Sequence, residues 1–438
     1  MSNISKKLGG ISLASLTLLA LAGCGTNGNV SSNNSTSGSN QPVQVTFWYG
    51  LGGALGKDVQ AMVDKFNATH PGIHIVATYQ GSYSGGGAEQ QKLLAAFRAG
   101  NQPDIAQIEV HSMPVFASTG KLLDVSQMMA QSAVDNPQNF LAGMLVSTQY
   151  NGKYYGVPFN RSVPVMYYNK TLFKQAGISS PPQTMTQLTT DAKKLTHGSG
   201  ATKVYGFEPL VDWWPWEYSV WSGGGQILSS DLSKTTFASA SATRVLSSEQ
   251  SLVKGGYATV ESGPQYWTLM EEDFIHGKVG MMFDSIGSAA FVKKGVGSQF
   301  EWGTALLPSD QTLAVPPGGG NVAIMSGIPQ AEQQAAWKFI QWWTSPQQTM
   351  TWSEMTGYLP VQKAAVQDNS YQQYLGANPQ FKTALEELKY QHPAPASSQY
   401  LAVLQYVQKA LEGIFDEGKP VSGTMQAAQT QADSVLGQ

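Results

Sequence analysis

Apolar strand-like segments and amphipathic helical segments alternate through residues 43–110, and this alternation limits the possible folds more than any other feature of the sequence. The order strand, helix, strand, helix, strand predicts an α/β fold with a mainly parallel sheet. Gly100 follows the second helix, where a left-handed glycine commonly ends a helix. Ligands of such sheets bind beyond the carboxyl ends of the strands. The expected strands cover 43–48, 73–79 and 105–110, and the loops after them cover 49–54, 80–87 and 109–113.

A second α/β unit is expected after Pro158, and the chain beyond residue 329 is expected to be mainly helical. With 438 residues the chain is long enough for two or three domains. We find no internal repeat. The further strands are expected at 163–168, 204–207, 279–283, 302–307 and 322–325. The C-terminal helices are expected at 330–344, 346–355, 380–390, 399–416 and 423–436.

The first 42 residues have the pattern of an export signal followed by a linker. Two lysines precede a short apolar segment, which ends in Leu21-Ala22-Gly23-Cys24 and resembles a bacterial lipobox. Residues 1–23 are therefore expected to be a lipoprotein signal peptide, and 24–42 a flexible linker. The predicted location is outside the cytoplasm, anchored to the cell membrane through a lipidated Cys24. The alternative is an ordinary secretory signal with a chance cysteine.

Composition excludes several kinds of chemistry. The single cysteine rules out an internal disulfide, a zinc site with several thiolates and an iron–sulfur cluster. Neither a phosphate-binding P-loop motif nor G-x-S-x-G occurs in the sequence. The net charge of −3 gives no reason to expect nucleic acid as a partner. We expect no catalytic residues, no cofactor and no metal.

Several stretches, in order along most of the mature chain, resemble the solute-binding proteins of ABC importers in the large carbohydrate-binding family. Within that family the resemblance is closest to the glycerol-3-phosphate-binding branch. It implies a lipid-anchored receptor that captures a carbohydrate, polyol or glycerol-phosphate-type solute and delivers it to ABC permease subunits, as a monomer. The stretches are Phe47-Trp48 with GALGK at 53–57, TYQGSY at 78–83, AFRAGN at 96–101, PFNRS at 158–162, VMYYNK at 165–170 and GYLP at 357–360.

The resemblance also implies the architecture: two α/β lobes joined by a hinge, each a mainly parallel sheet flanked by helices, with the ligand cleft at the hinge. The chain is expected to cross between the lobes near 159–164, 283–287 and 325–329. The N-terminal lobe would comprise 43–161 plus about 286–327, and the C-terminal lobe 162–285 plus about 328–438.

Ligand contacts carried over from the branch, position by position, fall on Tyr83, Glu109, Ser162, Trp213, Trp216, Ser285, Gly319 and Tyr358. The branch also holds the phosphate with an arginine near its C-terminus, but this chain has no arginine after Arg244. A buried phosphate dianion needs charge-assisted donors, which arginine supplies best. We therefore expect a neutral sugar, a polyol or a phosphodiester rather than a phosphate monoester.

The residues themselves leave alternatives open. Four tryptophans fall within nine residues, at 213, 214, 216 and 221, and they can either stack on sugar rings or pack in a core. Glu109 can accept hydrogen bonds from ligand hydroxyls or cap the next helix. Arg161 can pair with an anionic ligand or form a salt bridge between lobes. An ordinary surface role is expected for His111, a core role for Trp342 and Trp343, and either close ligand approach or a simple turn for Gly318–Gly320.

Two other classes of function compete with the transport receptor. A secreted carbohydrate-active enzyme would need two carboxylic acids on either side of a glycosidic bond. Glu109, Asp212 and Asp284 are candidates, but no spacing marks two of them as a pair. A solute sensor with the same fold is the remaining alternative.

Overall fold

The computed structural model describes residues 41–83 and 87–436. The chain divides into a unit of residues 1–41 and a compact unit of residues 42–438, and the second unit is described below. The expected signal peptide, the lipobox cysteine Cys24 and nearly all of the expected linker lie outside the described residues.

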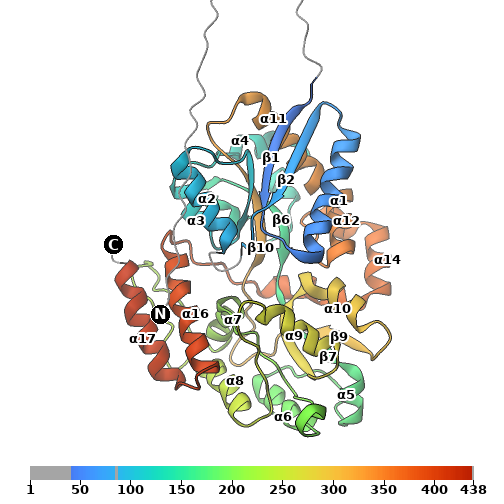
Figure 1. Cartoon of the computed structure of the whole chain (residues 1–438), viewed down its shortest axis with the longest axis vertical. Coiled ribbons are helices and arrows are strands. Elements are labelled where there is room, and N and C mark those ends of the chain that lie inside the picture. The colour runs from blue at the N-terminus through green and yellow to red at the C-terminus, as the bar shows by residue number, and fades with distance from the viewer. Residues whose placement is uncertain (1–40, 84–86, 437–438) are drawn as a thin grey trace, which may run out of the picture. The chain divides into compact units, whose positions relative to one another are not determined.

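A five-stranded sheet forms one half of the compact unit, drawn uppermost in Figure 1. β1 pairs in parallel with β2 and β3, as the sequence predicts, while β10 runs antiparallel to β3 and β6. In sheet order the strands are β2 (Ile73–Tyr79), β1 (Val43–Tyr49), β3 (Ile105–Glu109), β10 (Gly318–Ile324) and β6 (Val157–Ser162). β4 (Gln149–Tyr150) and β5 (Lys153–Tyr154) form a separate hairpin.

Helices cover this sheet, and the first of them buries the apolar face predicted from its spacing: Val59, Met62, Val63 and Phe66. In α2 the left-handed residue Gly100 ends the helix, as predicted. Trp343 is fully buried and Trp342 packs against the same core, which confirms their expected role. The helices of this half are α1 (Gly53–Thr69), α2 (Ala88–Ala99), α3 (Met113–Ser118), α4 (Ser126–Gln131), α11 (Gln330–Thr344) and α12 (Pro346–Thr356).

A three-stranded sheet in the order β8-β7-β9 forms the other half. Its strands are β7 (Pro164–Asn169), β8 (Met281–Ser285) and β9 (Trp302–Ala305). Both pairings are antiparallel, so the expectation of a mainly parallel second sheet is wrong. β8 and β9 lie on either side of β7, and both run opposite to it. Residues 205–208 add parallel pairing only as single bridges.

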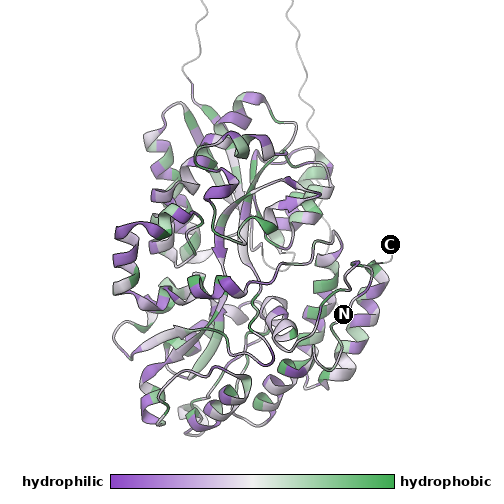
Figure 2. Ribbon diagram, turned by 180° about the vertical axis from the view of Figure 1, so that it is seen from behind, coloured by the Kyte–Doolittle hydropathy of each residue, from purple (hydrophilic) through white to green (hydrophobic). Residues whose placement is uncertain are grey.

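The second half carries most of the remaining helices (Figure 1). They are α5 (Lys170–Gln175), α6 (Met185–Leu195), α7 (Trp213–Ser222), α8 (Arg244–Lys254), α9 (Tyr266–Ile275), α10 (Ala289–Val296), α16 (Tyr400–Phe415) and α17 (Val421–Leu436). α13 (Lys363–Gln367), α14 (Asn369–Ala377) and α15 (Thr383–Glu387) connect α12 to α16. Figure 2 shows hydrophobic and hydrophilic residues alternating along the outer helices, as expected where one helix face packs on a core.

The two sheets join directly at one point. β6 ends at Ser162 and β7 begins at Pro164, so Val163 alone separates them. Two further segments meet the chain here: Ile286 N–H donates to the Val163 carbonyl at 3.1 Å, and Leu359 N–H donates to the Arg161 carbonyl at 2.8 Å. The first expected crossing is therefore in place.

Two segments do not follow the expected lobe boundaries. β9 lies within 286–327, which was assigned to the first lobe, yet it pairs with β7 of the second sheet. α11 and α12 lie beyond 328, yet α11 packs on β1, β6 and β10, and α12 packs on α1. The chain therefore stays with the larger sheet at 325–329 and does not cross there. The expectation was wrong because an amphipathic helix pattern does not specify which sheet the helix covers. The chain returns to the second sheet later, where α15 packs on β7.

Among the described residues, no helix combines the length and the apolar character needed to cross a membrane.

Candidate functional site

Three strand ends of the larger sheet meet at one edge. In the register of the sheet, Gly320 lies opposite Glu109 and Gly318 lies opposite Ser162. Gly319 has φ +88°, and an added Cβ would lie 1.6 Å from the Asn160 carbonyl oxygen, so only glycine fits there. The predicted residues Glu109, Ser162 and Gly319 are therefore neighbours through backbone pairing. Backbone geometry alone explains the glycine at 319.

Tyr83, Ser285 and Tyr358 converge beside this edge, around Asn160. The Asn160 side-chain amide donates to the Tyr83 hydroxyl at 3.1 Å. Burial raises the pKa of Tyr358, which Asn160 and Tyr83 partly offset through hydrogen bonds to its hydroxyl. The Tyr358 ring and the Ser285 hydroxyl both face Gly287, where a Cβ would lie 2.8 and 3.2 Å from their nearest atoms. Loop 80–83, the end of β6, the end of β8 and the Tyr358 loop thus contribute to one polar cluster.

Trp214 of α7 lies next to this polar cluster, on the side of the second sheet. Its indole N–H donates to the Pro317 carbonyl at 2.8 Å, and its ring lies parallel to Trp267 with 6.0 Å between ring centres. Ser162 and Trp214 both lie against Gly318, where a Cβ would come within 2.5 Å of each. Trp267 in turn donates to Asp284 at 2.8 Å. Trp214 is buried, so the partly exposed Trp267 presents the accessible indole, beside a carboxylate. An exposed indole face is a surface on which sugar rings can stack.

The two tryptophans predicted from the resemblance lie in different surroundings. Trp213 packs edge-to-face on His111, with 4.9 Å between ring centres, at the junction of the two sheets. Trp216 packs edge-to-face on Phe237 instead. All three tryptophans, Trp213, Trp214 and Trp216, are buried members of the apolar cluster of α7, α8 and α16, so their aromatic neighbours make the difference. The structure does not bring Trp216 to the other predicted residues. Its surroundings agree with the core alternative.

The Glu109 carboxylate caps the turn after β3 and is hydrogen-bonded within the chain. Its carboxylate accepts hydrogen bonds from the His111 backbone N–H at 2.9 Å and from the Ser112 hydroxyl at 3.0 Å. The His111 ring Nδ1 lies 2.6 Å from the same carboxylate. Both interpretations of Glu109 remain compatible with these contacts, because capping leaves acceptor capacity on the two oxygens.

His111 is completely buried, so its expected surface role is wrong. Its Nε2 lies 2.9 Å from Glu217 on α7, and the Tyr400 hydroxyl of α16 donates to the other oxygen of Glu217. α7 packs on the smaller sheet, since Tyr218 lies edge-to-face on Phe283 of β8. The chain Glu109–His111–Glu217–Tyr400, called the His111 network below, therefore links the end of β3 to helices of the other half.

Electrostatics holds His111 in its charged form. Burial alone would lower its pKa, but the negative charges of Glu217 and Glu109 outweigh burial and raise the pKa to about 10. A protonated imidazole donates from both nitrogens, which matches a carboxylate on each side. The His111 network is thus a buried cation between two anions.

Arg161 is the second buried cation at this edge, with 1% of its surface exposed. One terminal nitrogen donates to Ser147 at 2.5 Å and to Asn321 at 3.2 Å. Its Nε and its other terminal nitrogen have no partner, and it forms no ion pair within the described chain. The salt bridge between lobes is therefore not formed. Burial lowers the pKa of Arg161 to about 10, which leaves it charged at neutral pH.

The carboxylates named for the enzyme alternative all have local partners. Asp212 accepts from the Trp214 backbone N–H at 2.8 Å and so caps α7. Asp284 accepts from Trp267 and from the Ser285 backbone N–H. Burial raises the pKa of Asp212, and the nearby charges of Glu109 and Glu217 add to that rise.

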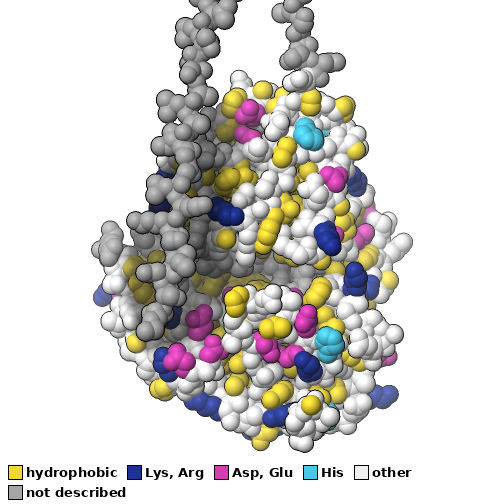
Figure 3. All heavy atoms as spheres, in the orientation of Figure 1, with side chains coloured by type: hydrophobic (Ala, Val, Ile, Leu, Met, Phe, Trp, Pro, Cys, Tyr) yellow, Lys and Arg dark blue, Asp and Glu magenta, His cyan; other side chains and the backbone are white. Residues whose placement is uncertain are grey.

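Sequence reasoning did not single out Asn160, Glu217, Trp267 and Tyr400, and it named Trp214 only as one of four clustered tryptophans. One signal was available: Glu217 is a lone carboxylate in an otherwise apolar and aromatic helical stretch, where an unpaired charge would be costly. Figure 3 shows the molecular face hollowed across its middle, with acidic side chains along the lower edge. A separate cavity of about 350 Å³ lies elsewhere, between Trp221, Ala314 and His392, and none of the predicted residues lines it.

Comparison with known proteins places these observations in a family. The family model described as bacterial extracellular solute-binding protein matches residues 51–350. The sn-glycerol-3-phosphate-binding periplasmic protein UgpB of Pectobacterium atrosepticum is 28% identical over 368 residues, which cover 78% of this chain and 79% of that protein. UgpB of Escherichia coli K12 is 28% identical over 359 residues, covering 76% and 78% of the two chains.

Solved structures agree with the fold. The chain matches UgpB from Mycobacterium tuberculosis, crystallised with glycerophosphocholine, with a TM-score of 0.78 and 25% identity over 90% of this chain and 98% of that one. It matches the GacH receptor of Streptomyces glaucescens with a TM-score of 0.79 and 20% identity over 90% and 98% of the two chains. The two-sheet architecture is therefore that of the two-lobed binding proteins, and the chain belongs to the family of bacterial extracellular solute-binding proteins.

Proposed function

We propose that this protein is the substrate-binding component of an ABC transporter, which captures a polyhydroxylated solute outside the cytoplasm and delivers it to the permease. The observation that carries the proposal is the convergence of polar and aromatic side chains from both sheets at the direct β6–β7 junction. Tyr83 and Ser162 come from the larger sheet, while Trp214, Trp267 and Ser285 come from the other half. A ligand that contacts both halves favours the closed arrangement over the open one.

The ligand site suits sugar or polyol chemistry. Sugar rings present C–H faces to aromatic planes, and their hydroxyls need fixed donors and acceptors. Trp267, stacked on Trp214, offers an aromatic plane, and the hydroxyls of Tyr83, Ser285 and Tyr358 offer the polar contacts. We propose Tyr83, Glu109, Ser162, Trp213, Ser285, Gly319 and Tyr358 as ligand-contacting positions, with Trp214 in place of Trp216.

A glycerophosphodiester is the second candidate ligand, and one observation favours it. Arg161 holds two buried nitrogens without partners, which can donate to a single negative charge. The C-terminal arginine of the glycerol-phosphate branch has no counterpart here, since Arg244 is the last arginine. A singly charged phosphodiester demands less compensation than a phosphate dianion, so we place it ahead of glycerol 3-phosphate.

Attachment to the membrane is proposed from the sequence. A lipidated Cys24 followed by a linker would hold the binding domain near its permease while leaving it free to rotate. Replacing Cys24 with Ala should release the protein from the membrane fraction or leave the precursor unprocessed. A Cys24→Ala protein that is still cut before residue 24 and still fractionates with membranes would contradict the lipid anchor.

The direct test of function is a ligand screen. Thermal-shift measurements with sugars, polyols and glycerophosphodiesters, followed by calorimetric titration, should identify a ligand that binds at about micromolar strength and is recovered unchanged. Recovery of a hydrolysed glycoside would support the enzyme alternative instead. Small-angle scattering should then show a smaller radius of gyration with saturating ligand, whereas an unchanged radius would argue against hinge closure.

A further inference from the structure

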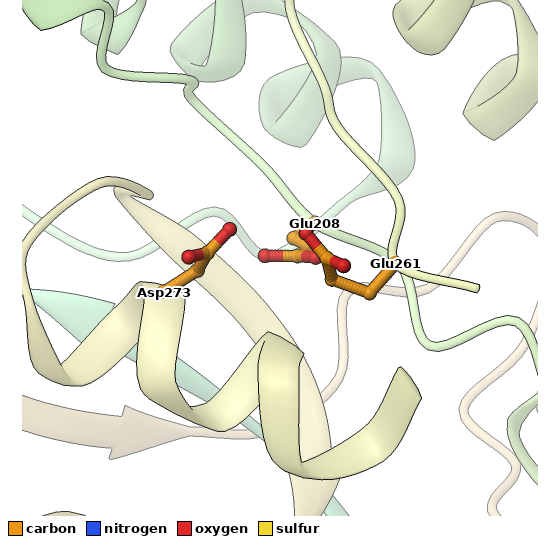
Figure 4. A group of neighbouring side chains, drawn as sticks. All are labelled: Glu208, Glu261 and Asp273. Carbon is orange, nitrogen blue, oxygen red and sulfur yellow. The ribbon is translucent and has the colours of Figure 1, made fainter. Parts of the chain in front are cut away.

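Three carboxylates from separate segments meet in the second half of the molecule (Figure 4). Glu208 lies on the segment that bridges to β8, Glu261 on the loop before α9, and Asp273 on α9. One carboxylate oxygen of each lies within 4.8 Å of those of the other two. Figure 4 shows the three side chains extending toward a common point.

A second observation, the burial of Glu208, indicates that the cluster lacks a bound partner. Its side chain is completely buried, and neither carboxylate oxygen has a hydrogen-bond partner. Buried polar groups almost always have one, so an orphaned carboxylate that points into an acidic cluster needs an explanation. Glu261 and Asp273 are only partly buried, so the cluster can be reached from solvent.

One cation is already near, but it does not satisfy the cluster. The Lys278 ammonium lies 2.6 Å from Asp273 on an exposed side chain. It forms no ion pair with Glu208 or Glu261 in the described chain. Lys278 therefore compensates one carboxylate at the rim and leaves the buried one without a partner.

We propose that Glu208, Glu261 and Asp273 bind a hard divalent cation, with Ca²⁺ as the preferred ion. Oxygen atoms separated by up to 4.8 Å fit around an ion whose oxygen ligands lie about 2.3–2.6 Å away. Carboxylate oxygens without histidine or cysteine favour Ca²⁺ or Mg²⁺ over zinc or copper. Ca²⁺ also accepts irregular geometry and completes its shell with water, which suits ligands from three unrelated segments.

The cation would act on the loop that leads into the proposed ligand site. Glu261 precedes α9, whose first residues are Tyr266 and Trp267. Tyr266 donates to Asp212, and Trp267 stacks on Trp214 and donates to Asp284. Tying Glu261 to Glu208 and Asp273 would fix the start and the body of α9 to the smaller sheet. The proposal concerns the binding domain itself and does not depend on the identity of the solute.

The test is calorimetric titration of the purified, chelator-treated protein with CaCl₂, followed by thermal unfolding with and without Ca²⁺. We expect one Ca²⁺ per chain and a melting temperature that rises with Ca²⁺ concentration. Glu208→Gln should weaken Ca²⁺ binding by at least about tenfold, because affinity depends on the number of charged ligands. Lys278→Ala should strengthen it, because that change frees the Asp273 oxygen.

Two variants keep the result interpretable. Glu272→Gln removes the same charge from an exposed position next to Asp273 and should leave Ca²⁺ binding unchanged. Glu261→Gln removes a partly buried ligand and serves if Glu208→Gln does not fold. Absence of Ca²⁺ binding by the wild-type protein, or equal binding by wild type, Glu208→Gln and Glu261→Gln, would overturn the proposal. A response to MgCl₂ stronger than that to CaCl₂ would overturn the choice of ion.

Discussion

His111 and Arg161 are both buried cations at the same edge of the larger sheet, and their surroundings are opposite. His111 lies between two carboxylates and links β3 to α7. Arg161 has no carboxylate within ion-pair distance, although the charge of Glu109 partly offsets the lowering of its pKa by burial, and two of its nitrogens have no hydrogen-bond partner. The desolvation cost of a buried charge is offset only when the partners are in place. The first cation is therefore part of the folded framework, whereas the second can gain a partner only from outside the chain.

The comparison separates two roles that the sequence could not distinguish. The sequence predicts an ordinary surface role for His111 and leaves Arg161 open between an anionic ligand and a salt bridge between lobes. The partners decide the matter: Glu217 is 106 residues from His111 along the chain and satisfies it within the fold. Arg161 has no such partner within the described chain, and under the proposed function an anionic group of a solute would supply one.

The largest effect is expected for His111→Gln. Removing the charge leaves Glu109 and Glu217 buried without compensation, which should lower the free energy of unfolding by about 3–5 kcal/mol. Denaturant unfolding followed by tryptophan fluorescence measures this change. His276→Gln, at an exposed position, is the matched control and should change stability by less than about 0.5 kcal/mol. Equal stability of the two variants would show that the His111 network does not stabilise the fold.

The pH dependence of the unfolding free energy tests the same network, because pH changes the charge of His111 without altering its side chain. Burial lowers the pKa of His111, but Glu217 on α7 and Glu109 on β3 outweigh it and hold the pKa at about 10, above the ordinary value of about 6.5. Tyr400 on α16 completes the network by donating to Glu217. The stabilising contribution is then fully present below pH 6.5 and is lost as pH rises toward 10. The difference in unfolding free energy between wild type and His111→Gln should shrink over that range. A difference independent of pH would show that His111 is uncharged in the fold.

A smaller effect, on binding rather than folding, is expected at the tryptophans. Trp213→Ala or Trp214→Ala should weaken solute binding by about 1.5–3 kcal/mol, or ten- to hundredfold, through loss of apolar contact. Trp216→Ala should instead lower stability, since Trp216 packs on Phe237 in the core. Calorimetric titration and thermal unfolding of all three variants separate the two effects. The assignment fails if Trp216→Ala folds normally and loses affinity while the other two bind as wild type does.

The smallest change in stability is expected for Arg161→Met. Replacing an unpaired buried charge with an apolar side chain of similar length should leave the free energy of unfolding unchanged or raise it by about 1 kcal/mol. Arg98→Met, at an exposed position, controls for the loss of one positive charge. A loss of several kcal/mol in Arg161→Met alone would mean that Arg161 is a structural residue like His111.

Local patterns predicted local structure well. The spacing of Val59, Met62 and Phe66 specified the buried face of α1. The junction at Val163 lies within the crossing near 159–164 that the family resemblance implied. Long-range pairing was beyond the sequence. The apolar pattern of α11 did not indicate which sheet it covers, and all ten residues of α7 are buried. Helical periodicity therefore could not separate Trp213 at the junction from Trp216 in the core.

The charge of the solute is the most direct test of the contrast between the two cations. Competitive titration should compare a neutral sugar or polyol identified in the screen, glycerophosphocholine and glycerol 3-phosphate, on wild type and on Arg161→Met. We predict that the neutral solute or the phosphodiester displaces glycerol 3-phosphate from the wild-type protein. Tight glycerol 3-phosphate binding that collapses in Arg161→Met would contradict this account, because it would show a phosphate monoester site at the hinge.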